Sequence, residues 1–257
     1  PIDHSLSPLV HNAAYQHLGL SDRYKFQAFP LKAEDLSSGL DTLRLIGAVG
    51  VSVTLPHKVN CVAFADEVSE AVRKIGASNT LIKKNHGWYA ENTDYLGILR
   101  PLEKITKLTG KKVAIIGASG AGRAAVYAMK TAGAEVTIFN RTNLKAAELS
   151  QEFKINFGSW EELSRLVDFD ILINCTSLGM NANDPLPLPE TALSNKQIVF
   201  DCIYHHQQTK LMKLATAKGA TVVHGLEMWR LIWVPSADTW RNLRLMRIHL
   251  FPRSRLE

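Results

Sequence analysis

The chain has 257 residues, of which 46% are hydrophobic and 21% charged, as is usual for a globular protein of one large or two modest domains. It contains no run of the ~20 apolar residues that a membrane helix needs and opens without a secretory leader, so we expect a cytoplasmic protein with no membrane partner. The net charge is +6, but the basic excess lies mainly in residues 229–257, without the interleaved aromatic residues of a single-strand binder, so we expect no nucleic-acid partner.

Three cysteines, Cys61, Cys175 and Cys202, are far apart in the sequence and lack the spacing of metal ligands. They indicate buried thiols in a reducing compartment and no metal site. His205 and His206 have no third ligand beside them, so we interpret them as surface residues. Because the chain does not begin with Met, we expect a fragment, a processed form or one module of a larger polypeptide.

Short helical and strand-like patterns alternate over the first part of the chain. Ser7 and Pro8 begin a predicted helix that ends near Gly19, where glycine is a common terminator. The further predicted elements are a strand at 24–29, a helix at 33–45, a strand at 50–54, a helix at 62–75, and a hairpin that pairs 80–82 with 88–90.

The pattern changes after Gly97. An amphipathic segment at 99–108 leads into a regular succession of strands at 113–116, 136–140, 171–174, 198–201 and 221–223, with helices at 123–132, 143–153 and 209–218. Strands that alternate with helices at this spacing predict a parallel, doubly wound sheet. We therefore expect an α/β protein with an N-terminal α/β domain at 1–97 and a Rossmann-type domain at 98–228. The segment 229–257 is a candidate for a return of the chain to the first domain.

A glycine-rich turn lies between the first strand and first helix of the second domain. Its candidate cofactor-binding residues are Gly117, Ser119, Gly120, Ala121 and Gly122. Glycines allow a pyrophosphate to approach the backbone, and the helix N-terminus offers it N–H groups and partial positive charge. The ordinary alternative is a tight turn before a packed helix.

The next strand ends in Asn140, Arg141 and Thr142, with no carboxylate. A cofactor with a free ribose 2′-hydroxyl prefers an acidic residue there, whereas a guanidinium suits a 2′-phosphate. The sequence thus favours NADP(H) over NAD(H). Alternatively, Arg141 caps a surface loop.

Polar residues of the kind found in binding sites gather in four clusters before residue 97. They are Ser5 with Ser7, Thr54 with Lys58, Asn79, and Asn92 with Asp94. Each has an ordinary explanation as a helix cap, a turn residue or a solvated lysine. Together, hydroxyls, amides, one lysine and one aspartate suit a polyhydroxylated acid as substrate.

These clusters occur within ordered motifs over residues 1–228 that resemble the shikimate dehydrogenase family. The motifs are His4-Ser5-Leu6-Ser7-Pro8, Val53-Thr54-Leu55-Pro56-His57-Lys58, Gly76-Ala77-Ser78-Asn79-Thr80, Asn92-Thr93-Asp94, the turn at 117–123, Asn140-Arg141-Thr142, 174–180 and 201–204. The resemblance implies a substrate held between two domains, with Ser5 and Ser7 on its carboxylate. It implies that the ring hydroxyls and the reacting carbonyl are held by Lys58, Asn79, Asn92 and Asp94. It also implies that Thr54 and Tyr204 lie beside the substrate. It adds Thr176, Ser177, Met180 and Gly225 on the nicotinamide side of NADP(H).

The implied activity is the NADP(H)-dependent interconversion of 3-dehydroshikimate and shikimate, with Lys58 as general acid or base and Asp94 as its orienting partner. Alternatives are a relative that acts on quinate or an aminated analogue, and a non-catalytic metabolite-binding homologue. The expected assembly is a monomer, a homodimer or a module of a multifunctional polypeptide.

The sequence departs from the family at three places. The family has a first strand that precedes the position of Pro1, and this sequence does not contain that strand. Ile232 stands where the family has a glutamine that reaches the substrate, and it cannot form that hydrogen bond. Pro235 would interrupt the helix expected there.

Overall fold

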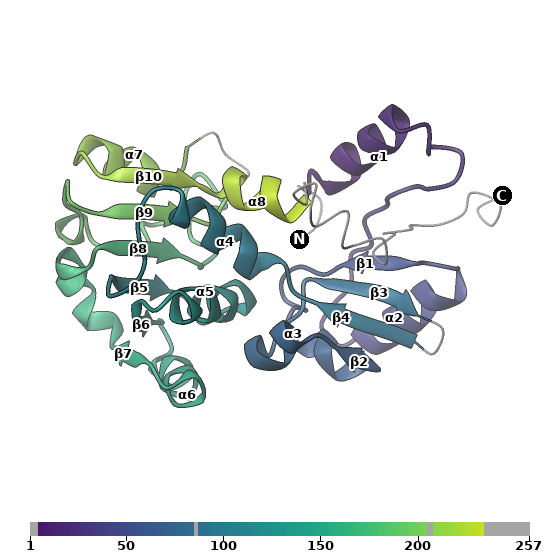
Figure 1. The fold of residues 1–257 in the computed structure, drawn as a ribbon, viewed down its shortest axis with the longest axis horizontal. Helices are drawn as coiled ribbons and strands as arrows, with labels where there is room; N and C mark the ends of the chain where they lie inside the picture. Colours follow the sequence, from purple (N-terminus) through teal and green to yellow (C-terminus); the bar gives the residue numbers. More distant parts are fainter. Residues whose placement is uncertain (1–4, 85–86, 205–207, 234–257) are drawn as a thin grey trace. The chain divides into compact units, whose positions relative to one another are not determined.

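The computed structural model describes residues 5–84, 87–204 and 208–233, which form two compact units (Figure 1). The first unit ends at Asn92 and the second begins at Thr93. The sequence placed the boundary after Gly97, but helix α4 (Asp94–Glu103) packs along α5 and α8 and so belongs to the second unit from its first residue.

The first unit contains a four-stranded sheet of order β1-β3-β4-β2. Its strands are β1 (Gly50–Ser52), β2 (Glu67–Val68), β3 (Thr80–Lys84) and β4 (Gly87–Glu91). β3 pairs antiparallel with β1 and β4, which confirms the predicted hairpin, and β2 runs parallel to β4. The helices are α1 (Ser7–His17), α2 (Leu36–Leu45), η1 (Asn60–Phe64) and α3 (Glu70–Ile75). The predicted apolar face of α2 is formed by buried Leu36, Leu40 and Leu43.

Two predicted elements of this unit are wrong. Residues 24–29 form no strand, because the side chain of Asn12 takes the place of a strand partner: its amide donates to the Phe26 carbonyl at 3.0 Å and accepts from the Phe26 N–H at 2.9 Å. The helix predicted at 62–75 is divided into η1, β2 and α3. Ser69 caps α3 by accepting from the Val72 N–H, while β2 pairs with Tyr89 and Ala90 of β4.

The second unit is built on a six-stranded, wholly parallel sheet of order β10-β9-β8-β5-β6-β7 (Figure 1). The strands are β5 (Lys112–Ile116), β6 (Glu135–Phe139), β7 (Asn156–Gly158), β8 (Ile171–Asn174), β9 (Ile198–Asp201) and β10 (Thr221–His224). The predicted Rossmann-type sheet is thereby confirmed. Strand order reverses between β5 and β8, the point at which such sheets bind their ligands.

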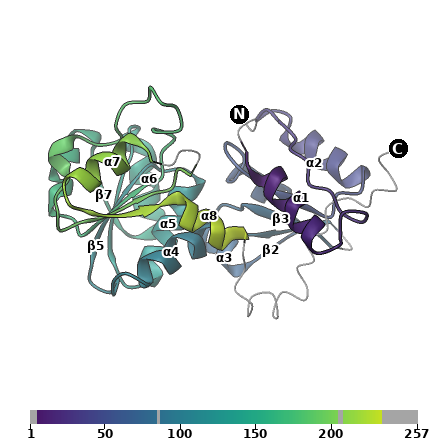
Figure 2. The same ribbon diagram turned by 90° about the horizontal axis from the view of Figure 1, so that it is seen from above.

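Helices cover both faces of this sheet (Figure 2). One face packs against α4, α5 (Gly120–Thr131), α6 (Asn143–Phe153) and α8 (Gly225–Trp233). The other packs against α7 (Lys210–Ala217) and the 3₁₀ segments η2 (Trp160–Asp168) and η3 (Glu190–Ala192). Strands buried on both faces explain the continuous apolar runs of the sequence. Within the described ranges, none of the helices has the length and apolar character required to cross a membrane.

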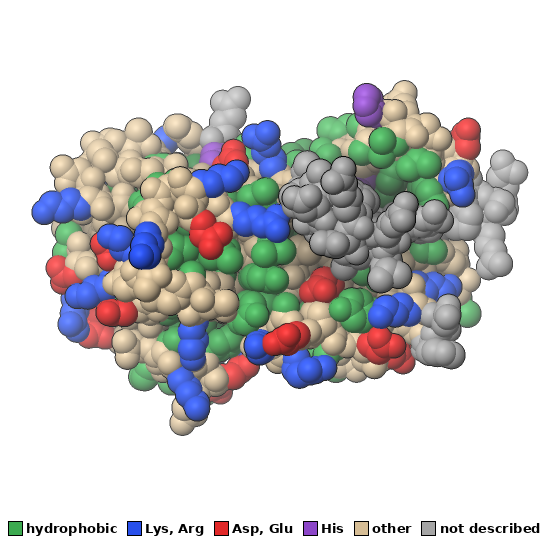
Figure 3. Space-filling view, in the orientation of Figure 1, with side chains coloured by type: hydrophobic (Ala, Val, Ile, Leu, Met, Phe, Trp, Pro, Cys, Tyr) green, Lys and Arg blue, Asp and Glu red, His purple; other side chains and the backbone are tan. Residues whose placement is uncertain are grey.

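Residues 205–207 and 234–257 lie outside the described part of the chain, and with them the expectations for His205, His206, Pro235 and the return of the tail. On the face of each unit that Figure 3 shows, Lys and Arg side chains are interspersed with Asp and Glu.

Candidate functional site

The glycine-rich turn of the second unit needs its glycines for steric reasons. Gly117 has a φ of +106°, and a Cβ there would lie 3.0 Å from the Cys175 carbonyl oxygen and from Cγ2 of Thr176. A Cβ on Gly122 would lie only 2.0 Å from the Gly117 carbonyl oxygen. The backbone therefore folds tightly onto itself at the start of α5, which has no acidic side chain in its first turn. This arrangement fits an anionic pyrophosphate.

Ser119 and Asn140 hold the turn in place. The Ser119 hydroxyl caps α5 by accepting from the Gly122 N–H at 3.2 Å and donates to the Cys175 carbonyl at 2.9 Å. Oδ1 of Asn140 accepts from the Ala118 N–H at 3.0 Å, and its Nδ2 donates to the Thr142 carbonyl at 3.0 Å. Asn140 thus joins the turn after β5 to the end of β6.

Arg141 and Thr142 follow β6 with exposed side chains. The tip of the strand carries no carboxylate, and Lys145 is also exposed on the first turn of α6. This cationic, hydroxyl-bearing end of β6 suits a 2′-phosphate rather than a free 2′-hydroxyl.

Buried polar side chains connect the ends of β8 and β9. Asn174 and Asp201 are 1% and 0% exposed, and Nδ2 of Asn174 donates to Oδ1 of Asp201 at 3.0 Å. Oδ1 of Asn174 accepts from both the N–H and the hydroxyl of Thr176. Burial raises the pKa of Asp201 above its ordinary value. The sequence patterns gave neither Asn174 nor Asp201 a role, although both ended predicted strands.

Asp94 and Tyr204 are brought close together in the second unit. Asp94 is 1% exposed in the first turn of α4, where the helix dipole favours a negative charge. Burial, and then the charge of Asp94, raise the pKa of Tyr204. The Tyr204 ring stacks on Trp229 at a centroid distance of 5.8 Å.

Gly97 and Gly225 allow helices to pack closely in the same region. A Cβ on Gly225 would lie 2.5 Å from the Ile203 carbonyl oxygen. A Cβ on Gly97 would meet the Met228 carbonyl at 3.0 Å and Ile232 at 3.1 Å. Ile232, where the resemblance led us to expect a glutamine, therefore packs between α8 and α4.

The first unit gathers four of its predicted residues at one end of its sheet. At this end, three residues pair across β1, β3 and β4, namely Ser52, Thr80 and Glu91. The candidate residues lie just beyond these paired positions in the sequence. The Asn79 carbonyl accepts from the Val53 N–H at 2.8 Å, next to Thr54.

Lys58 and Asn92 are attached to the same end. The carbonyl of Lys58 accepts from the Ser78 N–H at 2.7 Å. Nδ2 of Asn92 donates to the Ala77 carbonyl at 2.9 Å. Thr54, Lys58, Asn79 and Asn92 thus come together through backbone contacts around residues 77–79.

Two residues that support this cluster had no predicted role of their own. The fully buried Ser78 hydroxyl lies within hydrogen-bonding distance of the Thr80 and Glu91 carbonyls, at 2.9 and 2.8 Å. The Glu91 carboxylate accepts from the Asn92 N–H at 2.8 Å and from the Ser69 hydroxyl at 2.7 Å. The signal available in the sequence was a serine next to the start of a predicted strand.

Ser5 and Ser7 lie together at the start of α1. The Ser7 N–H donates to the Ser5 hydroxyl at 3.3 Å, and the Ser7 side chain is buried. On the next turn, His11 stacks on Phe26 at a centroid distance of 4.3 Å, and burial lowers the pKa of His11 to about 4. Its ring is therefore neutral at physiological pH.

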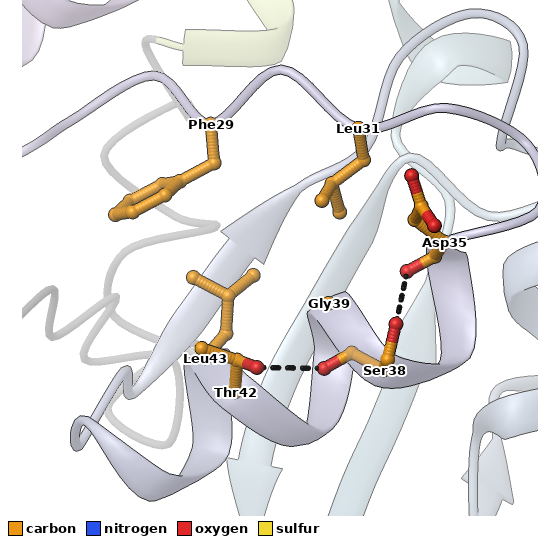
Figure 4. A pocket seen from close by; sticks show the side chains of 7 residues that line it. All are labelled: Phe29, Leu31, Asp35, Ser38, Gly39, Thr42 and Leu43. Carbon is orange, nitrogen blue, oxygen red and sulfur yellow. Dashed lines mark hydrogen bonds between the residues drawn. The ribbon is translucent and has the colours of Figure 1, made fainter.

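A cavity of about 290 Å³ lies elsewhere in the first unit, lined by Phe29, Leu31, Asp35, Ser38, Gly39, Thr42 and Leu43 (Figure 4). The Ser38 and Thr42 hydroxyls donate to backbone carbonyls of their own helical turn. None of the predicted site residues lines it. Across the described residues, no cluster of His, Cys, Asp and Glu has the form of a metal site.

A parallel sheet with a strand-order reversal and a glycine-rich turn at its first strand defines the second unit as a dinucleotide-binding domain of the Rossmann type. Residues 1–81 match the family described as the shikimate dehydrogenase substrate binding domain, and residues 101–183 match shikimate/quinate 5-dehydrogenase. These matches, and a relative that is 36% identical over 93% of the chain, show that the chain belongs to the shikimate dehydrogenase family.

Relatives and solved structures agree with these matches. Shikimate dehydrogenase (NADP⁺) of Syntrophobacter fumaroxidans is 36% identical over 244 residues, covering 93% of this chain and 84% of the relative. The crystal structure of shikimate dehydrogenase from Aquifex aeolicus has a TM-score of 0.82 at 33% identity, covering 95% and 94% of the two chains. The Thermus thermophilus enzyme, solved with NADP(H) and shikimate, has a TM-score of 0.82 at 31% identity, covering 99% and 94%.

Proposed function

We propose that the protein is an NADP(H)-dependent oxidoreductase that interconverts 3-dehydroshikimate and shikimate. The observation that carries the proposal is the gathering of one lysine, one hydroxyl and two amides at the end of the first unit's sheet, in a chain whose second unit has a turn suited to NADP(H). The family relationship, and relatives named as NADP⁺-dependent shikimate dehydrogenases, support it.

The first unit is the proposed substrate domain. Ser5 and Ser7 supply hydroxyls for the substrate carboxylate, and Thr54, Asn79 and Asn92 supply groups that recognise ring hydroxyls. Hydroxyls and amides suit this task because each can donate or accept a hydrogen bond. A site built from such groups rejects analogues that lack a hydroxyl, since its buried polar atoms would then lose their partners.

The second unit is the proposed cofactor domain. Gly117, Gly120, Ala121 and Gly122 form the turn for the pyrophosphate, and Ser119 and Asn140 fix its shape. Arg141 and Thr142 hold the 2′-phosphate. Thr176, Ser177, Met180 and Gly225 are the proposed nicotinamide-side residues, with Tyr204 beside the substrate. Bound NADPH supplies the hydride that reduces the ketone carbon.

Lys58 is the proposed general acid in ketone reduction and general base in alcohol oxidation. As hydride reaches the carbonyl carbon, the carbonyl oxygen acquires negative charge and needs a proton. An ammonium stabilises that charge and delivers the proton, which returns to the amine in the reverse direction. Asp94 is the proposed orienting partner of Lys58, because a carboxylate favours the charged form of a lysine.

The proposed compartment is the cytoplasm. The free thiols of Cys61, Cys175 and Cys202 suit a reducing environment of this kind.

A spectrophotometric assay tests the proposal. Production of NADPH or NADH is followed with shikimate, quinate or buffer alone as the substrate. We expect the highest kcat/KM for shikimate with NADP⁺. A higher value for quinate would transfer the assignment to the quinate-specific branch of the family. Tight binding of shikimate without turnover would indicate a metabolite-binding homologue instead.

The variant Lys58→Ala tests the proton-transfer role. We expect kcat to fall by roughly 10²- to 10⁴-fold, the usual contribution of a positioned acid or base, with a much smaller change in KM. Lys83→Ala, on an exposed position of β3, is the matched control and should retain activity. Nearly normal turnover by Lys58→Ala would remove Lys58 from the mechanism.

A double-mutant cycle tests the pairing with Asp94. If Lys58 and Asp94 act as a unit, the effect of Lys58→Ala with Asp94→Asn on kcat will be much smaller than the product of the two single effects. Independent, multiplicative effects would show that Asp94 does not act through Lys58.

A further inference from the structure

The ends of β8 and β9 carry a buried hydrogen-bond network that reaches three separate segments. Asp201 accepts at Oδ1 from the Asn174 side chain at 3.0 Å and from the Ile203 N–H at 3.2 Å. At Oδ2 it accepts from the Thr209 hydroxyl at 2.6 Å. That hydroxyl also caps α7 by accepting from the Met212 N–H at 3.2 Å. One carboxylate therefore joins β8, the chain after β9 and the start of α7.

Asn174 extends the network to the loop that follows β8. Its Oδ1 accepts from the Thr176 N–H at 3.1 Å and from the Thr176 hydroxyl at 2.7 Å, and its Nδ2 also donates to the Leu178 carbonyl at 3.3 Å. The Thr176 hydroxyl in turn accepts from the Leu178 N–H at 3.1 Å. Asn174 thereby fixes the first three residues of the loop after Cys175.

Thr176 also adjoins the glycine-rich turn. A Cβ on Gly117 would lie 3.0 Å from Thr176 Cγ2, so the methyl group covers the space that the glycine leaves open. A displacement of Thr176 would therefore change the surface that borders the turn but would leave the hydrogen bonds that Ser119 and Asn140 make within it. The network links the loop after β8 to the element that fits the pyrophosphate.

The cost of the network argues for a use beyond packing. Asp201 is fully buried, and burial raises its pKa although the charge of His224, its register partner on β10, acts to lower it. A buried carboxylate that is held mainly by neutral donors destabilises a fold relative to an apolar group of similar size. Neutral donors compensate for part of this cost and give the surrounding loops one defined arrangement.

The fold places the network beneath one half of the cofactor. In a doubly wound sheet, a dinucleotide lies across the point where strand order reverses, here between β5 and β8. Because Arg141 follows β6 and is proposed to bind the 2′-phosphate, the adenosine half of NADP(H) lies on the β6 side of this point. The nicotinamide half then belongs over the ends of β8 and β9, where Asn174 and Asp201 lie.

We propose that Asn174 and Asp201, linked to Thr209, are positioning residues that hold the loop at 176–180 and the chain at 203–204 in the arrangement that receives the nicotinamide ring. The proposal rests on the proposed NADP(H)-dependent function and assigns it two further residues. Both act through Thr176, Leu178 and Ile203 rather than by touching the reacting atoms.

Two near-isosteric variants remove the network's main hydrogen bonds. Asp201→Asn gives up an acceptor oxygen, and Asn174→Leu keeps the volume but loses the bonds to Thr176 and Leu178. We expect each to lower kcat by roughly 10- to 100-fold, the cost of misplacing reacting groups by about 1 Å. With 4-deuterated NADPH, we expect the isotope effect on 3-dehydroshikimate reduction to rise, because hydride transfer becomes slower than product release.

A cofactor fragment separates positioning from general damage to the domain. Adenosine 2′,5′-bisphosphate carries the 2′-phosphate half of NADP⁺ and lacks nicotinamide. Its Kd, measured by calorimetry, should stay within about two-fold of the wild-type value in both variants, because the turn and Arg141 remain intact.

Matched substitutions at Thr209 provide rescue and control. Thr209→Ser keeps the hydroxyl that binds Asp201 and should retain kcat, whereas Thr209→Val should resemble Asp201→Asn. Thr216→Val, at an exposed position near the other end of α7, should leave kcat and the isotope effect unchanged.

The outcomes separate this inference from the function on which it rests. A wild-type protein that does not oxidise shikimate would overturn the proposed function. A wild-type protein that does so, with unchanged kcat and isotope effect in Asp201→Asn and Asn174→Leu, would overturn the positioning role. Parallel loss of turnover and of adenosine 2′,5′-bisphosphate binding would also overturn it, because the residues would then support the whole domain.

Discussion

Arg141 distinguishes two cofactors that share almost all of their atoms. It lies exposed just after β6, at the end where a dinucleotide's adenosine ribose is bound in this fold. A planar guanidinium can donate two hydrogen bonds to one phosphate. A strand end that binds NAD(H) instead carries a carboxylate, which would repel the phosphate. The proposed cofactor selectivity depends mainly on the guanidinium of Arg141.

Arg141→Gln should weaken NADPH binding by roughly 10- to 100-fold, the effect of losing hydrogen bonds to a charged group. NADH binding should change little, because NADH has no 2′-phosphate. Fluorescence titration with both nucleotides measures the difference. Arg165→Gln, which removes an exposed arginine paired with Glu162, is the control. Equal weakening for both nucleotides would show that Arg141 does not recognise the phosphate.

At the scale of elements, the start of α5 shows how a helix and a turn form one binding surface. Gly122 lies in the first turn of the helix, directly against the carbonyl of Gly117. The close approach of the two backbones leaves no volume for a side chain. The N-terminal N–H groups of α5 and the turn are therefore fixed together, which helix propensity alone would not require.

Gly122→Ala should disrupt this element. The added Cβ would lie 2.0 Å from a backbone oxygen, so the turn must shift, and overpacking of this kind costs about 1–3 kcal/mol of stability. We expect a lower Tm and at least about ten-fold weaker NADPH binding, since the shifted N–H groups no longer meet the phosphates. Thr131→Ala, at the exposed end of α5, should do neither. Unaltered binding by Gly122→Ala would mean that the pyrophosphate does not use this turn.

The chain consists of two compact units, and each contains its own group of candidate residues. The first gathers its candidate residues at the end of a mixed sheet, and the second at the carboxyl ends of parallel strands. The proposed division of labour assigns substrate to the first and cofactor to the second. Each ligand should therefore stabilise its own unit first.

Hydrogen exchange tests this division. NADP⁺ alone should slow amide exchange at 117–123 and 140–142, and shikimate alone should slow it at 54–58, 77–79 and 91–92. Neither ligand alone should change exchange in the middle of α2, which carries no candidate residue. Protection of the second unit alone by shikimate would contradict the assignment of the substrate domain.

Local patterns predicted much of this organisation. The parallel sheet followed from apolar runs that alternate with amphipathic helices, and α6 begins at Asn143 and ends at Phe153 as predicted. The predictions were wrong where a side chain replaced a backbone partner or where a side-chain cap started a new helix. Asn12 binds Phe26 across 14 positions of sequence, and Ser69 starts α3 within what reads as one continuous helix.

Periodicity and short motifs were sufficient to assign the fold class, the family and the NADP(H)-type turn, and to nominate the residues of the two candidate sites. Which polar residues support others became clear from the contacts in the folded protein. Ser119 donates to the Cys175 carbonyl, Asn140 accepts from the Ala118 N–H, and Asp201 accepts from Asn174, 27 positions away. Such contacts are made between segments that meet only when strands pair and helices pack, so no local pattern encodes them.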